Sequence, residues 1–317
     1  MSSQYNKTPV ILDGDPGHDD AIAWVLAYAR KELDILGITS VSGNAPLEKT
    51  TKNMLQIATL LGMKNIPLAS GAARPLVREP FAAPSVHGES GLDGPVLPEP
   101  QVSLSKQNAV ELMAELISGS ELPVTLIPTG PLTNIATFLM TYPELKASIS
   151  QISLMGGGLY HGNWTPAAEF NILCDPEAAK IVFESGIPII MAGLDVTEKA
   201  LITPEDTNRI RKTGNKVSYI VADWLEFFYN FHKALGYPGA PVHDAVSVAA
   251  ITNPEILTTT NLYVEVETFG EYCTGATVGD FYNISGKPPN VTAIMDINRE
   301  AFAQLIVDAC EYFSGGQ

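Results

Sequence analysis

Four aspartates, Asp13, Asp15, Asp19 and Asp20, lie within eight residues near the N-terminus, in the run DGDPGHDD. Carboxylates this close together raise one another's pKa unless a cation or a shared proton offsets their charge. Ligands that are all oxygen suit a hard ion such as Ca²⁺ or Mg²⁺. The run is therefore predicted to form a metal site.

The elements around this run predict an α/β fold. Short β-branched segments alternate with longer helical patterns, and parallel strands need such helical crossovers. We expect a mostly parallel, doubly wound central sheet with flanking helices, in one domain over residues 1–317. Strands are expected at 10–12, 33–41, 124–127, 152–155 and 187–191, and helices at 21–30, 47–61, 106–117, 135–140, 176–184, 245–252 and 299–313. Segments 262–269, 276–284 and 291–297 have strand character with no helix between them, so antiparallel strands are expected at an edge of the sheet.

Polar clusters follow several of these strands. In an open parallel sheet, ligands bind beyond the carboxyl ends of the strands. The aspartate run follows the first strand, and the segments 42–44, 129–134 and 156–158 follow later ones. Each cluster alone has an ordinary explanation as a helix cap or a turn. Their coincidence at one edge favours a shared site.

Further polar residues lie downstream. Glu169 and Asn171 are two residues apart, which places them on one face of an extended segment, with Asn163 upstream. A carboxylate and a carboxamide together can bind neighbouring hydroxyls, although these side chains could also stabilise their own loop. Asp244 either caps the helix that follows it or completes the metal shell, which leaves His243 free as an acid.

The long loop at 71–100 carries six prolines and the segment HGESGLDG, which begins at His87. Loops of this length are usually functional or disordered, and the polar segment indicates an active-site loop. His18 is expected to pair with a neighbouring carboxylate, whereas His161 and His232 are interpreted as structural or surface residues.

Composition limits the partners. The 317-residue chain has 19 basic and 35 acidic side chains, and the net charge of −16 opposes binding to nucleic acid or to anionic membranes. A neutral or cationic small molecule is the expected partner. Three separated cysteines predict no disulfide framework, and Met1–Thr8 lacks the apolar stretch of a signal peptide. We therefore expect a soluble cytoplasmic protein.

Seven motifs in order resemble those of the inosine-uridine preferring nucleoside hydrolase family. They are DGDPGHDDA, SGN, HGESGLDGP, PTGPLTNIA, LMGGG, AEFNILCDPEAA and PVHDA, and they span positions 10 to about 250. The resemblance implies a nucleoside hydrolase fold that binds one Ca²⁺ and cleaves the N-glycosidic bond of ribonucleosides to free base and ribose, as in nucleoside salvage. It also implies a homodimer or homotetramer.

Carried over by motif, the resemblance implies that the carboxylates of Asp15, Asp20 and Asp244 and the backbone carbonyl of Thr129 bind calcium. The ion would also hold a water molecule, from which Asp15 takes a proton. Asp13 would orient its neighbours. The residues implied to hold the ribose hydroxyls are Asp19, Asn44, Asn163, Glu169 and Asn171.

The two histidines of the motifs bear on the base. His243 is the implied acid for the leaving base, and His87 is a second base contact, as in pyrimidine-preferring members. Some of those members carry a polar or Tyr side chain where ungapped spacing places Phe231 and Leu235 here, and Tyr229 or Tyr237 could substitute. The base preference is open between pyrimidine nucleosides, uridine or cytidine, and purine nucleosides, inosine or another.

Two other functions compete with hydrolysis of nucleosides. An aspartate phosphatase would use Asp13 as nucleophile and Asp15 as acid, but Gly17 stands where that family has Thr or Val. A non-catalytic nucleoside or pentose sensor would keep the metal and sugar sites and lose Asp15 or His243. Both of these residues are present.

Overall fold

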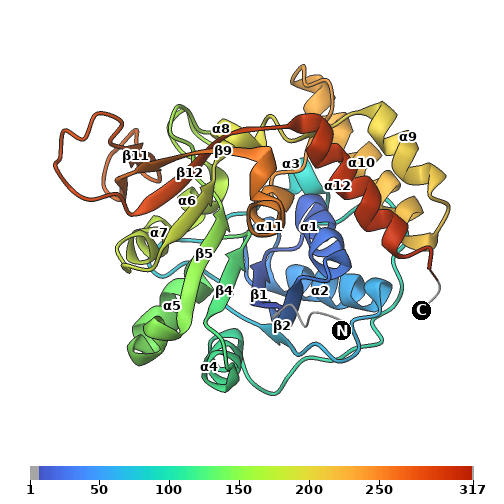
Figure 1. Cartoon of the computed structure of the whole chain (residues 1–317), viewed down its shortest axis with the longest axis horizontal. Coiled ribbons are helices and arrows are strands. Elements are labelled where there is room, and N and C mark those ends of the chain that lie inside the picture. The colour runs from blue at the N-terminus through green and yellow to red at the C-terminus, as the bar shows by residue number, and fades with distance from the viewer. Residues whose placement is uncertain (1–6, 316–317) are drawn as a thin grey trace, which may run out of the picture.

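An eight-stranded sheet forms the centre of the computed structural model, which describes residues 7–315 (Figure 1). The strand order is β3-β2-β1-β4-β5-β6-β12-β9, and every pairing is parallel except that of β12 with β9. The predicted mostly parallel sheet with an antiparallel edge is confirmed. The strands are β1 Thr8–Gly14, β2 Leu33–Ser40, β3 Leu68–Ser70, β4 Val124–Pro128, β5 Ile149–Met155, β6 Ile189–Ala192, β9 Leu257–Leu262 and β12 Val291–Ile297. Residues 1–6 and 316–317 of the predicted domain lie outside the described residues.

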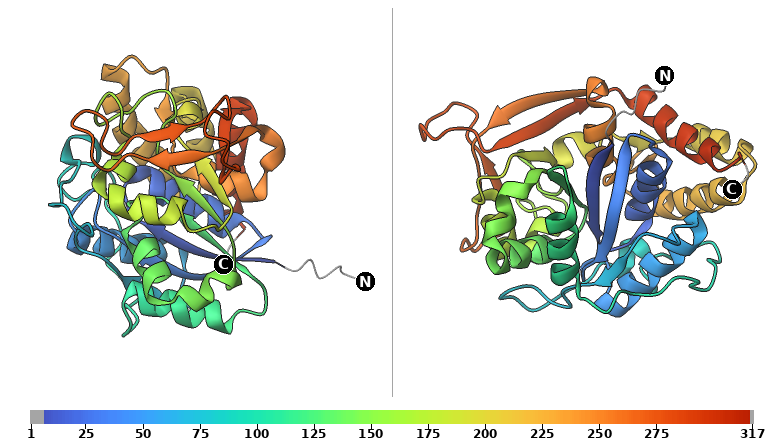
Figure 2. Two further views of the ribbon diagram at one scale, coloured as in Figure 1. Left: turned by 90° about the vertical axis from the view of Figure 1, so that its left-hand side faces the viewer. Right: turned by 60° about the horizontal axis from the view of Figure 1, so that its bottom comes forward.

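Helices cover both faces of the sheet (Figure 2). Alternate residues of β1 show why both faces are buried: Val10 and Leu12 pack into one apolar cluster, and Ile11 packs into the other. Helices α1, α2, α10, α11 and α12 contribute to the first cluster, and α4, α5 and α7 to the second. The helices are α1 His18–Ala29, α2 Leu47–Leu61, α3 Pro84–His87, α4 Ala109–Gly119, α5 Thr133–Thr141, α6 Phe170–Cys174, α7 Pro176–Phe183, α8 Leu194–Thr197, α9 Pro204–Lys212, α10 Lys216–Ala234, α11 Ala245–Thr252 and α12 Arg299–Tyr312. Among the described residues, no helix is long and apolar enough to cross a membrane.

The C-terminal strands differ in part from the prediction. β12 matches the expected 291–297, but it pairs in parallel with β6, so β9 alone forms the antiparallel edge. The strands expected at 262–269 and 276–284 are shorter than predicted: Leu262 ends β9, and β10 Val264–Val266 and β11 Thr277–Gly279 form a separate antiparallel pair. The second segment ends early because the carboxylate of Asp280 accepts the amide N–H groups of Ile284 and Ser285, which closes a turn.

The carboxyl ends of β1, β2 and β4 meet at one edge. β1 lies between β2 and β4, where the strand order changes direction, and this is the usual ligand position in an open parallel sheet. The chain beyond each strand is held in place, because the N–H of Thr129 donates to the carbonyl of Asp13 at 2.8 Å and that of Val41 donates to the carbonyl of Gly14 at 2.8 Å. The polar clusters expected from the sequence therefore do meet at one edge.

Candidate active site

A cavity of about 180 Å³ opens at this edge of the sheet. The short helix α3 brings the 71–100 loop to it, and His87 at the end of that helix is 5% exposed. Asp15 and Asp20 are fully buried, and they are not among the side chains that line the cavity. The predicted residues that do line it are Asp19, Asn44, His87, Thr129, Asn163, Glu169, Asn171, His243 and Asp244.

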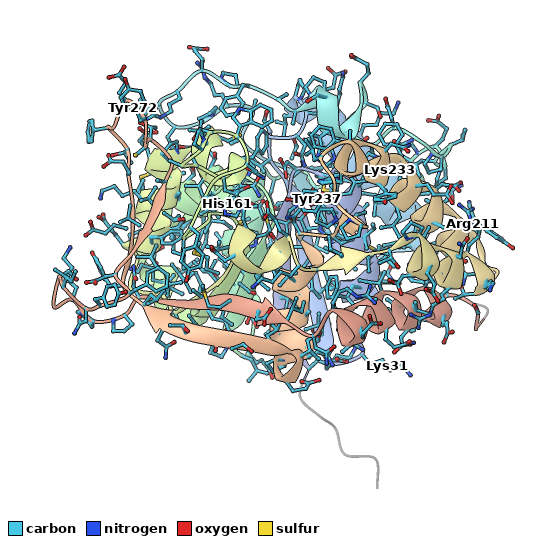
Figure 3. The ribbon with its side chains drawn as sticks, turned by 90° about the horizontal axis from the view of Figure 1, so that it is seen from above. Lys31, His161, Arg211, Lys233, Tyr237 and Tyr272 are labelled. Carbon is cyan, nitrogen blue, oxygen red and sulfur yellow. The ribbon has the colours of Figure 1, made fainter. Side chains whose placement is uncertain are left out.

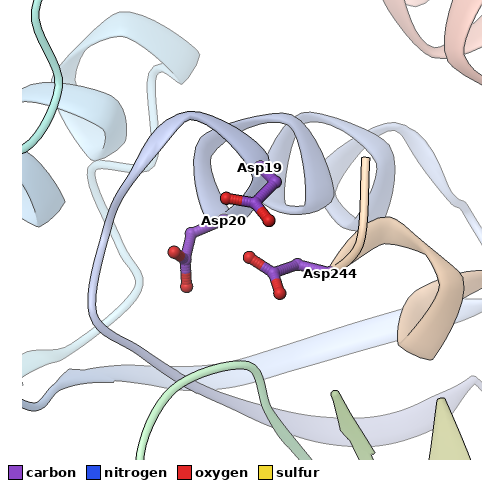
Figure 4. Close-up of side chains that lie close together, drawn as sticks. All are labelled: Asp19, Asp20 and Asp244. Carbon is purple, nitrogen blue, oxygen red and sulfur yellow. The ribbon is translucent and has the colours of Figure 1, made fainter. Parts of the chain in front are cut away.

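Three carboxylates gather beside the cavity. Each of Asp19, Asp20 and Asp244 places an oxygen within 4.8 Å of the others (Figure 4). The first two lie in the first turn of α1, where the helix dipole favours negative charge. Asp244 precedes α11, but its side chain makes no capping hydrogen bond, so the helix-cap explanation for it is not supported.

Asp15 lies next to this cluster and is held by its neighbours. Its Oδ2 accepts the backbone N–H of Asn44 at 2.6 Å, and its Oδ1 has no hydrogen-bond partner among residues 7–315. Gly43 and Gly130 pack directly against the carboxylate, since a Cβ at Gly130 would lie 2.6 Å from Oδ1 and one at Gly43 would overlap Oδ2. The SGN and TGPLTN motifs therefore supply glycines because the carboxylate leaves no space for a side chain.

Burial raises the pKa of every carboxyl group in this region. The loss of hydration is the largest cause, and it raises the pKa of Asp13 to about 7, that of Asp19 to about 8 and that of Asp20 to about 6. The pKa values of Asp15 and Asp244 also rise well above the usual range, through burial and then through the neighbouring aspartates. The group is stable only with bound protons or with a cation.

The donor set fits a calcium ion. Calcium–oxygen distances of about 2.3–2.6 Å put two opposite ligands about 5 Å apart, which matches the span of the three carboxylates. Thr129 is beside them, because its Oγ1 donates to Asp20 Oδ1 at 2.7 Å. The buried Oδ1 atoms of Asp15 and Asp19, without partners in the described part of the chain, are further free ligands.

Asp13 supports the site from behind. Its Oδ1 accepts hydrogen bonds from Thr39 Oγ1 at 2.5 Å and Asn134 Nδ2 at 2.7 Å. Asn134 in turn receives the N–H of Ala72 on its own Oδ1 at 2.8 Å. Asp13 thus ties the ends of β1 and β2 to the start of the long loop and lies away from the cavity.

The prediction that Glu169 and Asn171 share a face of an extended segment is wrong. Glu169 caps α6, and its carboxylate accepts the N–H groups of Asn171, Ile172 and Gly157 at 2.9–3.2 Å. Asn171 lies in the first turn of the helix, and its Nδ2 donates to the carbonyl of Thr129 at 2.9 Å. The helical turn still brings both side chains to the cavity, because a capping side chain and the first turn lie at the same helix end.

The two predicted base contacts enter from different elements. His243 precedes α11, and its Nδ1 lies 2.8 Å from Thr197 Oγ1. Burial lowers the pKa of His243 to about 3, so its imidazole is neutral at pH 7. The pKa of His87 is also lowered by burial and by the nearby histidines. Neither ring is a ready source of a proton in the free protein.

The sequence suggested that His18 pairs with a neighbouring carboxylate, and this prediction is wrong. Its Nε2 lies 2.7 Å from the backbone carbonyl of Asp93, and its Nδ1 lies 3.1 Å from His87 Nδ1. The ring is stacked between aromatic neighbours, with centroids 4.9 Å from Phe227 and 5.6 Å from Phe228. The two histidines thus connect the long loop to α1 and α10.

One wall of the cavity is formed by α10 and the segment after it, of which the sequence indicated only Phe231, Leu235 and Tyr237 as positions near the base. Tyr237 and Glu198 line the cavity, whereas His161, whose Nε2 lies 3.0 Å from Glu198 Oε2, does not; Tyr237 and His161 are labelled in Figure 3. Burial, followed by Glu198, raises the pKa of Tyr237 to about 12. Spacing of apolar residues at three and four positions along 216–234 could have revealed the helix. The cavity residues that the sequence did not indicate include Trp164, Glu198, Phe228 and His232.

Known proteins match this architecture over almost the whole chain. The sequence profile of the inosine-uridine preferring nucleoside hydrolase family matches residues 10–304. The pyrimidine-specific ribonucleoside hydrolase RihA of Escherichia coli O1:K1 / APEC is 53% identical over 308 residues, which cover 96% of this chain and 99% of that protein. The solved purine-preferring ribonucleoside hydrolase from Gardnerella vaginalis is 30% identical with a TM-score of 0.89, and covers 96% of this chain and 98% of its own. A solved inosine-guanosine nucleoside hydrolase is 28% identical with a TM-score of 0.88, at coverages of 96% and 99%.

Proposed function

The chain belongs to the inosine-uridine preferring nucleoside hydrolase family and is a ribonucleoside hydrolase, an N-glycosyl hydrolase, and we propose that it acts on pyrimidine nucleosides with the help of one Ca²⁺. The observation that carries the proposal is the meeting of three carboxylates at a cavity lined by carboxamide, carboxylate and imidazole side chains. Such a cavity has groups for a metal ion, for sugar hydroxyls and for a heterocyclic base.

The preference for uridine and cytidine is supported by the relative named pyrimidine-specific, at 53% identity, against 30% for the solved purine-preferring enzyme. His87 and His243 both line the cavity, as the resemblance to pyrimidine-preferring members had implied. Phe231 and Leu235 line it where some of those members carry polar side chains, and Tyr237 supplies a hydroxyl nearby. Tyr229 instead packs against the apolar core.

The ion is proposed to bind the carboxylates of Asp15, Asp20 and Asp244 and the carbonyl of Thr129. When bound, Ca²⁺ supplies the positive charge that keeps these buried carboxylates ionised and lowers the pKa of a coordinated water. Asp15 is the proposed general base, because its Oδ2 is fixed by Asn44 and its Oδ1 is free to take a proton from the attacking water. Asp19 and Asp244 are the two members of the three-carboxylate group that line the cavity, and Asp19, which is not among the proposed metal ligands, is suited to a contact with a ribose hydroxyl.

The ribose is proposed to contact side chains from two parts of the chain. Asn44 lines the cavity from the segment after β2, and Asn163, Glu169 and Asn171 line it from the segment that leads into α6. Three backbone N–H groups hold the Glu169 carboxylate in one orientation, so little freedom is lost when it accepts a hydroxyl. Such fixed carboxylates also favour the positive charge that develops on the sugar as the glycosidic bond breaks.

The leaving base is proposed to lie against His87 and His243. A neutral His243 acts as a hydrogen-bond donor to the base if its Nδ1 accepts from Thr197, since its Nε2 then carries the proton. That donor stabilises the negative charge that the departing base acquires. The negative charge of the base raises the pKa of the imidazole, so that His243 can pass its Nε2 proton to the base and take up a proton from solvent water on Nδ1, which leaves the ring neutral.

Cytoplasmic localisation and assembly into a homodimer or homotetramer remain proposals. The first is supported by the three cysteines, of which none is in a disulfide within residues 7–315. The second is supported by exposed apolar side chains on the C-terminal strands and turns, including Phe269, Tyr272, Tyr282 and Ile284. Tyr272 lies at the outer end of this region (Figure 3). Light scattering after gel filtration measures the oligomer directly.

Release of ribose from uridine, cytidine, inosine and adenosine tests the function. We expect kcat/KM for the two pyrimidine nucleosides to exceed that for the two purine nucleosides. A higher value for inosine or adenosine would contradict the base preference. Binding of all four without any release of ribose would instead indicate a nucleoside-binding protein.

A further inference from the structure

We propose that His18 is a positioning residue that fixes His87 as a hydrogen-bond acceptor toward the base, so that the enzyme selects bases that present an N–H group. Uracil presents its N3–H and cytosine presents its exocyclic amine. The inference rests on the proposed function only for the identity of the ligand. The state of the two rings follows from the contacts of the protein itself.

The contacts of His18 fix its tautomer. A carbonyl oxygen can only accept, so the 2.7 Å contact between His18 Nε2 and the carbonyl of Asp93 requires the proton to be on Nε2. The His18 ring is 0% exposed and stacked between Phe227 and Phe228, and such an apolar setting favours the neutral form. A neutral ring that carries its proton on Nε2 has a lone pair on Nδ1.

The tautomer of His87 follows from its contact with His18. Its Nδ1 lies 3.1 Å from His18 Nδ1, and two lone pairs at this distance would repel. His87 must therefore carry its proton on Nδ1 and donate it to His18. The backbone N–H of His18 also faces His87 Nδ1, but at 3.4 Å this contact is longer than an ordinary hydrogen bond.

The Nδ1 proton leaves a hydrogen-bond acceptor at the opposite edge of the His87 ring. With the proton on Nδ1, Nε2 has a lone pair, and no hydrogen bond from residues 7–315 occupies that atom. The ring lines the cavity and is stacked on Phe228 with centroids 5.4 Å apart, which holds its plane. A fixed acceptor in a buried site discriminates strongly against ligands that cannot donate to it.

This arrangement gives the long loop a part in selecting the base. The carbonyl of Asp93 fixes His18, and the side chain of Asp93 accepts the N–H groups of Glu89 and Ser90, which holds the loop in its turn. The carbonyl therefore lies at a fixed position relative to α1. Sequence alone could not reveal this, because Asp93 contributes its backbone rather than its side chain.

Nitrogen NMR of the full-length protein with ¹⁵N-labelled histidine tests the tautomers without substrate. We expect His87 Nε2 to give a pyridine-type resonance and His87 Nδ1 a pyrrole-type one, with the reverse pattern for His18. A pyrrole-type His87 Nε2 would overturn the proposal, because it would mean that His18 is doubly protonated and that His87 is a donor. This measurement does not depend on the reaction catalysed.

Two substitutions test whether the tautomer of His87 determines which bases the enzyme accepts. His18→Phe keeps an aromatic ring and removes both nitrogens, whereas Phe227→Leu alters the packing of His18 and keeps them. The readout is the ratio of kcat/KM for uridine to that for 3-methyluridine, which has no N3–H. We expect His18→Phe to lower this ratio about 10-fold, the size of one hydrogen bond, and Phe227→Leu to leave it close to that of the wild type.

Equal ratios in the wild type and His18→Phe would refute the proposal, as would an equal fall in both variants, which would indicate a packing role. If His18→Phe does not fold, the nitrogen resonances of the wild type still decide the tautomer. Loss of ribose release from every nucleoside in the wild type would count against the proposed function and leave the tautomer result standing.

Discussion

Asn44 holds Asp15 through two hydrogen bonds, from its backbone N–H to Oδ2 at 2.6 Å and from its Nδ2 to the backbone carbonyl at 3.2 Å, while Oδ1 of Asp15 has no partner in the described residues. One oxygen is fixed and the other is free, at a position closed in by Gly43 and Gly130. This is the geometry expected of a base that must be aligned before it accepts a proton. Asp13 also has an unpartnered oxygen, Oδ2, but its Oδ1 accepts two hydrogen bonds behind the site, so position rather than a free oxygen distinguishes Asp15 from it.

Substitution Asp15→Asn is expected to lower kcat for uridine about 100-fold or more, because the amide cannot accept the proton of the attacking water. The fold should be retained, since the change removes one like charge from a buried acidic group. Thermal unfolding of the metal-free variant should occur at or above the wild-type temperature. Near-normal release of ribose would rule out Asp15 as the base.

Substitution Gly43→Ala is expected to lower kcat about 100-fold through displacement of the Asp15 carboxylate, because a Cβ there overlaps Oδ2. Gly119→Ala is the matched control, since a Cβ at this last residue of α4 meets nothing within 4 Å. The control should keep full activity and gain about 0.5 kcal/mol in the free energy of unfolding. Equal activity of both variants would contradict the role of Gly43.

Removal of divalent cations is expected to lower both activity and thermal stability, because Asp19, Asp20 and Asp244 are then left as neighbouring buried carboxyl groups. Addition of Ca²⁺ should raise the unfolding temperature in proportion to the logarithm of its concentration. Differential scanning calorimetry after treatment with a chelator measures this. Unchanged unfolding with and without Ca²⁺ would argue against a calcium site.

The metal-free protein should lose stability as the pH rises from about 6 to 8. Burial raises the pKa of Asp20 to about 6, that of Asp13 to about 7 and that of Asp19 to about 8, whereas the unfolded chain has ordinary aspartates. The folded state therefore binds more protons than the unfolded state over this range, so its stability falls with increasing pH. Ca²⁺ should weaken this dependence. Urea unfolding at several pH values measures it, and an increase in stability from pH 6 to 8 would contradict the prediction.

The sequence predicted the parts of the fold that local patterns determine. The helices at 47–61 and 245–252 form with the expected bounds: the first has apolar residues at helical spacing, the second is buried on all sides, and their ends are marked by Gly62 and Asn253. The pairing of β12 with β6 was not predictable in this way. It joins Val291 to Ile189, and a contact over 100 residues leaves no local pattern in either segment.

The site was predicted where its residues follow strands. Asn44 and Thr129 were found because each follows the carboxyl end of a parallel strand. Phe228 and His232 were not predicted to line the cavity, since an aromatic side chain and a lone histidine in a helix give no local sign that they face a ligand. The roles of Gly43 and Gly130 were also missed, because a glycine gives no sign of which neighbour needs its space.

His243→Ala tests how the leaving base is stabilised. Burial lowers the pKa of His243 to about 3, so the ring is neutral through the physiological range and contributes a hydrogen bond. The loss of kcat should be about 100-fold for uridine and much smaller for p-nitrophenyl riboside, whose leaving group needs no such help. His232→Ala is a useful comparison, because His232 lines the same cavity while its Nδ1 bonds the carbonyl of Phe228. We expect it to affect both substrates equally, through packing. Equal losses on both substrates in His243→Ala would exclude a role for His243 in departure of the base and would leave it as a residue that only shapes the cavity.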